Sequence, residues 1–556
     1  MKKTKKAQTR VQTAPVRRGE VYEIGIDRLG TSGEGVGRYE NFTVFVPNAL
    51  PGERVTVRIE EVKTSYARGR LTEILQQSND RIAPLCGLYE ACGGCQLQHL
   101  SYAAQLRAKR QQVIDALSHI GKLPHVLVRE TLAAQSPWNY RNKMQFPIGL
   151  AKGNIVVGCF AQGSHTIIDT ENCHIQREPN NALANAVRAI AAQLRIPVYN
   201  EDTHKGILRH IVGRVGQNGD LMAVIVTATK QLPRAKEFVR LLREHLPNLV
   251  SVHQNIQTYR NNVIMGRDTV LLWGKPTILD GLGRLHFHIS PRSFFQVNTQ
   301  QAERLYEQAL SYADLHGTET VIDAYCGTGT ITLFLAQRAR KVYGIEIVQP
   351  AILDARKNAR DNHVKNAEFI VGDATKVMPA LYKQGIRPDV VVVDPPRAGC
   401  TPTVLQTFAD MKPQRIIYVS CNPATLARDL AILKEHGYHA QEVQPVDLFP
   451  QTSHVETVAL LSKLDVDKHI DVEIKLDELD LTSAESKATY AQIKKYILEK
   501  FDLKVSTLYI AQIKKKCGIV LREHYNKSKK EKQVIPQCTP EKEEAIMDAL
   551  RHFKMI

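Results

Sequence analysis

The side chain best placed for chemistry is Cys421, in the stretch "YVSCNP" at residues 418–423. The apolar run before it predicts a buried strand. That strand ends at Cys-Asn-Pro because proline cannot continue a hydrogen-bonded ladder and keeps the preceding residue out of a helix. Unpaired cysteines are commonly interior residues, but Cys421 follows the apolar run instead of lying within it. This position at a strand tip favours a nucleophile over a core residue.

A second candidate is Glu456, which begins the predicted strand "ETVALLS" two residues after His454. A carboxylate at a strand tip in a partly dry cleft can have a raised pKa and accept a proton. A solvent-exposed glutamate at a strand start is common, so only its pairing with Cys421 distinguishes Glu456. A thiolate that adds to carbon 6 of uracil gives carbon 5 carbanion character towards a methyl sulfonium. A base then removes the carbon 5 proton, and the thiolate is expelled.

Strands and helices alternate from residue 285 to about residue 463, which predicts a doubly wound, Rossmann-like α/β domain. In "VIDAYCGTGTITLFLA" a strand ends at Asp323, and a Gly-x-Gly turn opens a helix whose first N–H groups face a ligand. Glu346 and Asp373 follow the second and third strands. Acidic residues at both positions are typical of an S-adenosylmethionine site, although a dehydrogenase also places an acid after the second strand.

The fourth strand ends in "VVVVDPPRAG", with Asp394 at its tip. Methyltransferases that act on exocyclic amines resemble Asn-Pro-Pro-Tyr here, and RNA cytosine-5 methyltransferases resemble Pro-Cys. This sequence has Arg397 where the stacking aromatic residue would be, and no cysteine directly follows the prolines. The candidate nucleophile is instead Cys421, at the end of the fifth strand.

Five stretches together resemble the RNA uridine-5 methyltransferase family in order and spacing: "SFFQVN" (293–298), "DAYCGTGT" (323–330), "DPPRAGC" (394–400), "YVSCNP" (418–423) and "FPQTSHVETV" (449–458). The resemblance implies that Cys421 is the nucleophile and Glu456 the base. It also implies S-adenosylmethionine contacts for Gln296, Tyr325, Glu346, Asp373 and Asp394. The family's equivalent of Gln296 has also been placed near the target base. Thr330 stands where some members carry asparagine, so no cofactor role is transferred to it.

Residues 16–78 follow a basic tail (1–15) and read as short strands separated by glycine-containing turns, which predicts a small OB-like β-barrel. The stretches "DRLGTSGEGVGR", "VFVPNALPGERV" and "ARGRLTEIL" resemble a TRAM domain in their order. The resemblance implies an RNA-binding barrel, and an unrelated small barrel is the alternative.

A cysteine cluster lies in residues 79–284, where mixed strands and helices predict an α+β central domain. Cys86, Cys92 and Cys95 supply three thiolates, and Cys173 offers a fourth. By charge and geometry, four thiolates suit zinc and an iron–sulfur cluster equally well. Family members with an N-terminal TRAM domain share this spacing and bind a [4Fe-4S] cluster, so the resemblance implies that cluster.

Two further features accompany these motifs. Cys159 and Cys326 lie near them but match no ligand position. The helix that follows the cysteine cluster is expected to be amphipathic, with Arg107, Lys109 and Arg110 on its exposed side.

The chain of 556 residues carries 74 Lys and Arg against 57 Asp and Glu, a formal charge of +17. This surplus favours a polyanionic partner, with nucleic acid as the leading candidate. No apolar run approaches the roughly 18 residues needed to span a bilayer, and the basic start lacks the apolar stretch of a signal peptide. We therefore expect a cytoplasmic, monomeric protein with mostly reduced cysteines.

The barrel, the central domain and the Rossmann-like domain (285–464) together resemble the branch that acts on 23S ribosomal RNA. We therefore expect methylation of carbon 5 of a specific uridine in that RNA. Methylation of the T loop of transfer RNA and a non-catalytic RNA-binding role are the alternatives. Residues 465–556 lie outside the resemblance and predict a small helical appendage, either a helix-turn-helix-like module or a solvated basic one.

Overall fold

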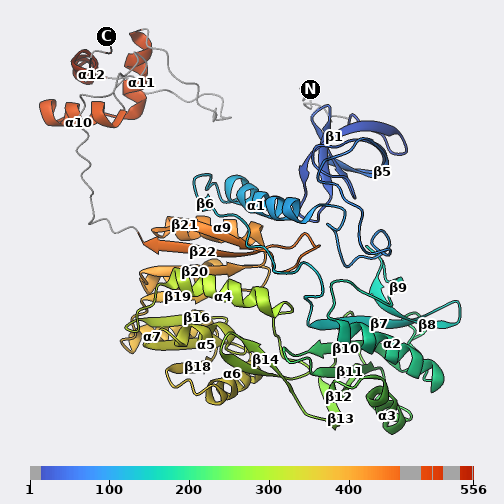
Figure 1. The fold of residues 1–556 in the computed structure, drawn as a ribbon. Helices are drawn as coiled ribbons and strands as arrows, with labels where there is room; N and C mark the ends of the chain where they lie inside the picture. Colours follow the sequence, from blue (N-terminus) through green and yellow to red (C-terminus); the bar gives the residue numbers. More distant parts are fainter. Residues whose placement is uncertain (1–13, 464–489, 504, 518–538, 554, 556) are drawn as a thin grey trace, which may run out of the picture. The chain divides into compact units, whose positions relative to one another are not determined.

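The computed structural model describes residues 14–463, 490–503, 505–517, 539–553 and 555 (Figure 1). The chain divides into two compact units, Met1–Asp465 and Val466–Ile556, each with a hydrophobic core of its own. Most of the predicted basic tail lies outside the described residues.

The N-terminal barrel is closed, with the strand order β1-β2-β3-β5-β4. Its strands are β1 (Val21–Leu29), β2 (Gly35–Tyr39), β3 (Phe42–Val46), β4 (Arg54–Val62) and β5 (Tyr66–Gln76). Alternate residues point inward, so that Val55, Val57 and Ile59 are buried. The glycine at position 37 is required, because a Cβ there would lie 2.2 Å from the carbonyl oxygen of Gly25. The predicted N-terminal barrel is confirmed.

Helix α1 (Tyr102–His119) and strand β6 (Leu127–Val128) come before the middle sheet but pack on the C-terminal one. Strand β6 pairs in parallel with β21 (Tyr438–Val446) of that sheet. The apolar residues of this segment, such as Leu117, lie in the same hydrophobic core as the C-terminal sheet. The sequence assigns the segment to the central region, whereas its packing joins it to the domain that follows.

The basic residues of α1 differ in exposure. The side chain of Arg107 is 60% exposed, as expected, and Arg110 is partly buried. The prediction that Lys109 lies on the exposed side is wrong, because its side chain is 1% exposed and forms an ion pair with Asp447. From sequence alone, a basic residue in a helix is assigned to the surface, because the partner that pairs with it lies in a distant loop and cannot be identified.

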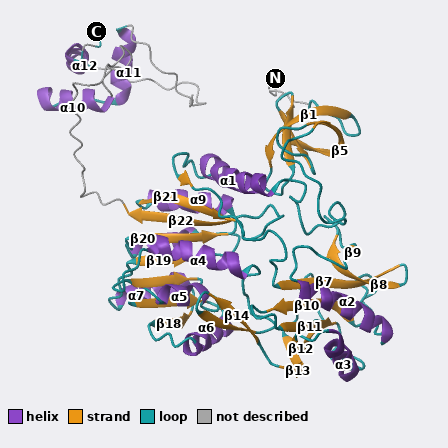
Figure 2. Cartoon of the chain, in the orientation of Figure 1, coloured by secondary structure: helices purple, strands orange, loops and turns teal. Residues whose placement is uncertain are grey.

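The middle of the chain forms a seven-stranded sheet in the order β13-β12-β11-β10-β7-β8-β9, in which only β11 and β12 are parallel neighbours. Helices α2 and α3 pack on it (Figure 2). The elements are β7 (Lys143–Ala151), β8 (Asn154–Phe160), β9 (Ile167–Asp169), α2 (Glu178–Gln193), β10 (Leu208–Val215), β11 (Leu221–Thr227), α3 (Ala235–His245), β12 (Leu249–Ile256) and β13 (Asp268–Gly274). Every residue of β10 and β11 is buried, because alternate side chains of these strands join the core shared with the C-terminal sheet.

The C-terminal sheet has eight strands in the order β18-β17-β16-β19-β20-β22-β21-β6, and β22 runs antiparallel to its neighbours. A hairpin and α4 lead into it. The elements are β14 (Ile278–Leu282), β15 (Leu285–Ile289), α4 (Thr299–Ala313), β16 (Thr320–Ala324), α5 (Thr330–Ala336), β17 (Lys341–Glu346), α6 (Gln349–Asp361), β18 (Ala367–Val371), α7 (Ala374–Lys383), β19 (Val390–Val393), α8 (Pro402–Asp410), β20 (Arg415–Ser420), α9 (Pro423–Glu435) and β22 (Glu456–Lys463). The alternation of strands and helices in the sequence produces this doubly wound arrangement.

The second unit contains α10 (Tyr490–Phe501), α11 (Thr507–Lys516) and α12 (Pro540–His552), which pack around apolar residues such as Ile497, Ile510 and Ile546. Among the described residues of the whole chain, no helix has the length and apolar character to cross a bilayer. The expected cytoplasmic location stays a prediction.

Candidate active site

The tips of three neighbouring strands bring together the residues proposed for chemistry. Asp394 follows β19, Cys421 follows β20, and Glu456 begins β22. Strands β20 and β22 are antiparallel, and Ser420 is the partner of Thr457. One step further in this register, Cys421 lies opposite Glu456. The hydroxyl of Thr457 donates to the carbonyl oxygen of Ser420 at 3.0 Å, which fixes this pairing.

Cys421 is held at the point where β20 turns into α9. Asn422 caps the helix, and its side-chain oxygen accepts from the backbone N–H of Ala424 at 3.1 Å. Proline at the first helical position needs no hydrogen-bond acceptor, so the chain can turn immediately after the cysteine. The sequence "CNP" therefore ends the strand, caps the next helix and leaves the thiol at the edge of the sheet.

The surroundings of Cys421 favour its neutral form. Burial, followed by the negative charges of Glu456 and Asp394, raises the pKa of the thiol to about 11, and Arg397 opposes this rise. Glu456 is itself buried. Burial and the charge of Asp394 raise its pKa well above the ordinary value, again against Arg397. Burial also raises the pKa of Asp394 to about 6. Three acidic groups therefore share one desolvated corner, in which each negative charge disfavours the next.

The loop of residues 447–455, which precedes Glu456, is anchored by α1. Asp447 accepts from Lys109 and, at 2.9 Å, from the hydroxyl of Tyr102. The side-chain amides of Gln105 and Gln451 are joined at 3.0 Å. The loop is also tied to the cysteine-rich segment, because the backbone N–H groups of residues 96 and 97 both donate to the carbonyl oxygen of Gln451 at 3.0 Å. These bonds hold the loop of residues 447–455 in place, and Glu456 follows it directly.

The first three strands of the sheet present the residues expected to hold a nucleoside cofactor. Glu346, at the end of β17, accepts from the backbone N–H groups of Gly327 at 3.3 Å and Val348 at 2.9 Å. Asp373 is exposed, caps α7 and accepts from the backbone N–H of Thr375 at 2.8 Å. The hydroxyl of Thr332 donates to one oxygen of the buried Asp323, and the other oxygen of Asp323 has no partner among the described residues. This orphaned oxygen beside a glycine turn fits a site that receives a polar ligand.

Tyr306 of α4 lies between Gln296 and the corner formed by Cys421, Glu456 and Asp394. Its ring is buried, and the side chains of Gln296 and Thr330 and the charges of Asp394 and Glu456 influence the pKa of its hydroxyl. Burial raises the pKa of this phenol, so it stays neutral and can donate. The sequence did not single out Tyr306, because a tyrosine on the buried side of a helix reads as core.

The SFFQVN loop is fixed from the middle sheet. Asn142 donates to the carbonyl oxygen of Gln296 and to the hydroxyl of Thr299, both at 2.9 Å. Asn298 caps α4 and donates to the carbonyl oxygen of Leu448 at 3.1 Å. Gln296 therefore lies between the middle sheet and the loop that precedes Glu456. Tyr325, which follows β16 and has a φ of +76°, lies near Cys400.

A second group of cysteines lines a separate cavity of about 270 Å³. The predicted ligands all face it: Cys86, Cys92, Cys95 and Cys173. Cys159, which matches no ligand position, lines the same cavity. Nine cysteines fall in the described part of the chain, and all are free thiols. Cys326 is buried beside Asp323 and Glu346, away from this group.

The arrangement of these cysteines bears on which metal group the cavity could hold. Within the described residues, no three His, Cys, Asp or Glu side chains are grouped so as to hold a metal ion. A single zinc ion needs its sulfur ligands at about 2.3 Å from one centre. An iron–sulfur cluster holds four cysteines around a larger body, and four thiols around one cavity fit that arrangement by their chemistry. The cluster stays a prediction.

Comparisons with known proteins agree with this architecture. Residues 276–464 match the family described as tRNA (Uracil-5-)-methyltransferase, and residues 15–72 match the TRAM domain. An uncharacterised RNA methyltransferase of Halalkalibacterium halodurans is 49% identical over 451 residues, which cover 81% of this chain and 98% of that protein. One from Clostridium tetani is 49% identical over 449 residues, covering 81% of this chain and 97% of its own.

Among solved structures, the tRNA (uracil-54, C5)-methyltransferase of Pyrococcus abyssi in complex with S-adenosyl-L-homocysteine is 29% identical. The match covers 79% of this chain and 99% of that one, with a TM-score of 0.63. The fold and site thus define an RNA methyltransferase with an N-terminal TRAM domain. The chain belongs to the RNA uracil-5 methyltransferase family.

Proposed function

We propose that the protein methylates carbon 5 of a specific uridine in 23S ribosomal RNA, with Cys421 as nucleophile and Glu456 as base. The observation that carries the proposal is the corner of Cys421, Glu456 and Asp394 on adjacent strand tips. Cys421 loses its proton to solvent and adds to carbon 6 as a thiolate, which leaves carbon 5 able to attack the methyl group of S-adenosylmethionine. Glu456 then takes the carbon 5 proton, and the carbon–sulfur bond breaks to return the thiolate.

The electrostatic repulsion between Cys421 and Glu456 sets the order in which the thiolate adds and the carbon 5 proton is removed. A thiolate at Cys421 and a carboxylate at Glu456 repel each other, as the raised pKa of the thiol reflects. Once the sulfur is bonded to carbon 6, the negative charge has moved onto the uracil ring, and transfer of the methyl group neutralises it. The pKa of Glu456 then falls, and its carboxylate becomes available when the carbon 5 proton must be removed. The positive charge of Arg397 lowers the pKa of both groups and therefore stabilises their negatively charged forms.

S-adenosylmethionine supplies the methyl group as a positively charged sulfonium. Glu346 would hold its ribose hydroxyls, and Asp373 would lie at its adenine edge. Asp394, Tyr325 and Gln296 would line the methionine end, and Gln296 could instead contact the target base. The orphaned oxygen of Asp323 and the turn of Gly327 support this assignment.

We also propose that Cys86, Cys92, Cys95 and Cys173 hold a [4Fe-4S] cluster. The common cavity of these four thiols supports the proposal. The backbone N–H groups of residues 96 and 97, which follow Cys95 directly, bind the loop of Glu456 through Gln451. A cluster at this place would brace that loop and take no part in methyl transfer itself.

A specific observation favours a second target, the T loop of transfer RNA. The matched family and the Pyrococcus abyssi enzyme are both described by transfer RNA, and the catalytic motifs do not distinguish the two substrates. The test is to map 5-methyluridine across ribosomal and transfer RNA from cells with and without the gene. Loss of the base from 23S ribosomal RNA alone is the expected result. Loss from transfer RNA alone would replace the proposed target with the second one.

A further inference from the structure

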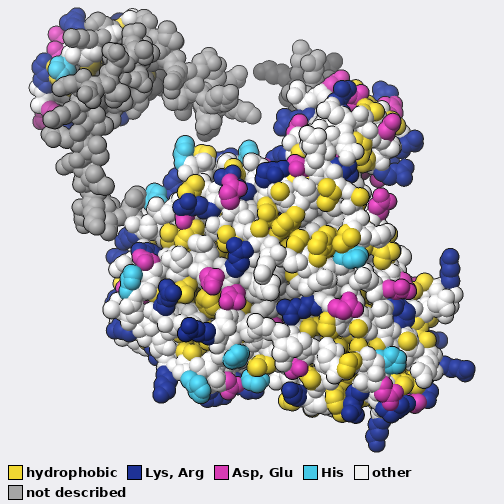
Figure 3. Space-filling model, viewed as in Figure 1, with side chains coloured by type: hydrophobic (Ala, Val, Ile, Leu, Met, Phe, Trp, Pro, Cys, Tyr) yellow, Lys and Arg dark blue, Asp and Glu magenta, His cyan; other side chains and the backbone are white. Residues whose placement is uncertain are grey.

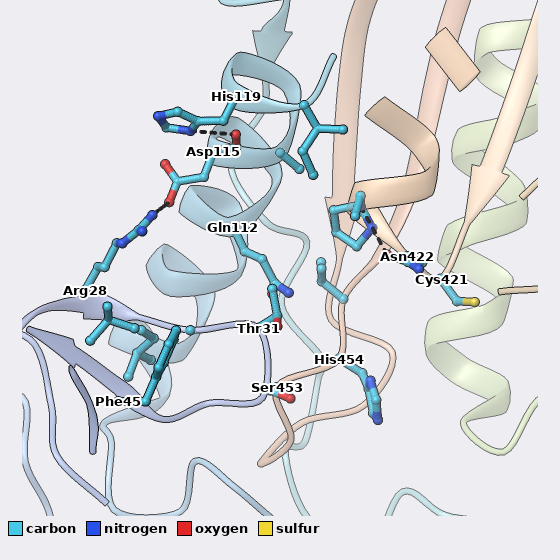
Figure 4. A pocket seen from close by; sticks show the side chains of 18 of the residues that line it. Arg28, Thr31, Phe45, Gln112, Asp115, His119, Cys421, Asn422, Ser453 and His454 are labelled. Carbon is cyan, nitrogen blue, oxygen red and sulfur yellow. Dashed lines mark hydrogen bonds and ion pairs between the residues drawn. The ribbon is translucent and has the colours of Figure 1, made fainter. Parts of the chain in front are cut away.

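A cavity of about 700 Å³ extends from Cys421 to the N-terminal barrel. Barrel residues from β1 to β3 form one wall, the second half of α1 forms another, and the start of α9 with residues 453–455 forms the third (Figure 4). This volume lies within the range of small-molecule sites, roughly 300–1,000 Å³. The chemistry described above uses only the Cys421 end, and the remainder of the cavity has no role in it.

We propose that this cavity binds the nucleotide adjacent to the target uridine in single-stranded RNA, with its base stacked on Phe45. The proposal rests on the proposed function, since it takes Cys421 as the point where the target ring is held. In Figure 4 the sulfur of Cys421 points away from the barrel, and Phe45 lies at the opposite side of the cavity. The target ring must lie on the sulfur side, beside Glu456 and Asp394. The space towards the barrel is therefore left for a neighbour in the same strand.

Phe45 is prepared as a stacking surface. It is partly buried, and Tyr66 of β5 packs edge-on against it with ring centroids 5.5 Å apart. The guanidinium carbon of Arg68, its register partner on β5, lies 5.8 Å from the ring centroid. These neighbours fix the ring on the barrel side, while the ring also lines the cavity. A rigid aromatic ring that faces a cavity suits a nucleobase, because every base presents a flat face.

The charges around the cavity suit a phosphodiester chain. Arg38 and Arg397 are exposed, and neither side chain has a hydrogen-bond or ion-pair partner among the described residues. Asp115 is the one carboxylate that the structure places in the lining, and it is paired with Arg28 at 3.5 Å. A cavity with an aromatic ring, free cations and one neutralised acid favours a single-stranded polyanion. A double helix is too wide to enter it.

The test uses the full-length protein and a nine-nucleotide oligouridylate that carries a single 2-aminopurine at its centre. Stacking on Phe45 quenches the fluorescence of this base. Phe45→Leu is expected to relieve the quenching and to weaken binding roughly 5- to 150-fold. Phe45→Trp keeps a stacking ring and should retain both the quenching and the affinity. Tyr259→Leu, at an exposed ring outside the cavity, is the matched control and changes neither. Unchanged quenching and affinity in Phe45→Leu would overturn the proposal.

A paired charge variant adds a second readout. Arg38→Gln is expected to lower the slope of binding against salt by about one counterion. Arg58→Gln, on the same barrel but outside the cavity, should leave the slope nearly unchanged. Equal effects of the two variants would mean that the barrel binds RNA only through its general charge, and would contradict the proposal.

A photocrosslink decides the matter if Phe45→Leu does not fold. Wild-type protein with 4-thiouridine at the centre of the oligouridylate should crosslink within the tryptic peptide of residues 39–54, which contains Phe45. Crosslinks confined to other peptides would overturn the proposal. Neither readout requires catalysis, so a failure of the stacking subsite is distinguishable from a failure of Cys421 as the nucleophile.

Discussion

Two groups of cysteines in this chain have similar exposure and different neighbours. Cys421 is partly buried among two carboxylic acids and an arginine, whereas Cys86, Cys92, Cys95 and Cys173 are partly buried among one another. Charged neighbours of either sign shift the pKa of a thiol. Thiols that line one cavity can together bind a metal cluster. In the proposed assignment, the neighbours, more than the burial, separate the reactive cysteine from the ligating ones.

The two groups are connected through the loop of residues 447–455. The backbone after Cys95 and the side chains of α1 both bind this loop, and Glu456 follows it. The four proposed cluster ligands should therefore affect catalysis only through support of the loop, whereas Cys421 should affect it directly. Variants in the two regions test whether the two groups of cysteines differ in this way.

The largest expected effect follows Cys421→Ala. Without the thiolate, carbon 5 is not activated, and the rate of methyl transfer should fall at least about 10⁴-fold. Transfer of labelled methyl groups to RNA measures it. Cys517→Ser, in the second unit, is the control and should leave the rate unchanged. A loss of less than tenfold in Cys421→Ala would contradict the role of this residue.

Glu456→Gln should separate adduct formation from release. The amide cannot take the carbon 5 proton, so multiple-turnover formation of free methylated RNA should fall by roughly 10²–10⁴-fold while methylated covalent protein–RNA complex accumulates. Removing a negative neighbour also lowers the pKa of Cys421 from about 11, because that charge raises it. Below this pKa the rate of adduct formation follows the thiolate fraction, so its pH profile should move to lower pH. A profile that stays in place, or moves upward, would contradict the coupling.

Cys95→Ala should affect the fold more than the chemistry. Loss of a cluster ligand should remove iron, abolish the broad absorbance near about 400 nm of an anaerobic preparation and lower the melting temperature by roughly 10 °C. Cys159 lines the same cavity without a predicted ligand role, so Cys159→Ala should retain the iron. If both variants keep the same metal content as the wild type, the cluster assignment fails.

The last expected effect is on stability alone and concerns the ion pair of Lys109 and Asp447. Lys109→Ala leaves a buried carboxylate with one partner fewer and should cost about 3–5 kcal/mol of unfolding free energy. Arg107→Ala, on the exposed side of α1, should cost less than about 1 kcal/mol. Denaturant unfolding measures both. Equal losses would mean that α1 does not anchor the loop through Lys109.

The sequence predicted the parts of the site that depend on strand ends. Apolar runs that stop at Asp323, Asp394 and Cys421 indicate the edge of the sheet, because the ladder and the burial stop together. The antiparallel return of β22 beside β20 could not be read locally, since pairing joins segments that are distant in sequence. The family resemblance supplied the partnership of Cys421 and Glu456 instead.

Long-range packing accounts for what the sequence did not predict. Lys109 reads as a surface residue and is buried because Asp447 comes to meet it. Tyr306 reads as core and reaches the catalytic corner because α4 packs beside β20 and β22. The approach of Phe45 to the same cavity as Cys421 depends on how the barrel sits on α1. On the face in Figure 3, hydrophobic side chains gather below the barrel, where it meets α1 and the loops beside it.

One measurement tests the central claim most directly. RNA from cells lacking the gene, with 5-fluorouridine in place of uridine, is incubated with the protein and S-adenosylmethionine, and the complex is digested and analysed by mass spectrometry. Fluorine at carbon 5 cannot leave as a proton, so the thioether should persist on the tryptic peptide of residues 416–428, which contains Cys421. An adduct on any other peptide, or one that forms equally in Cys421→Ala, would contradict the account.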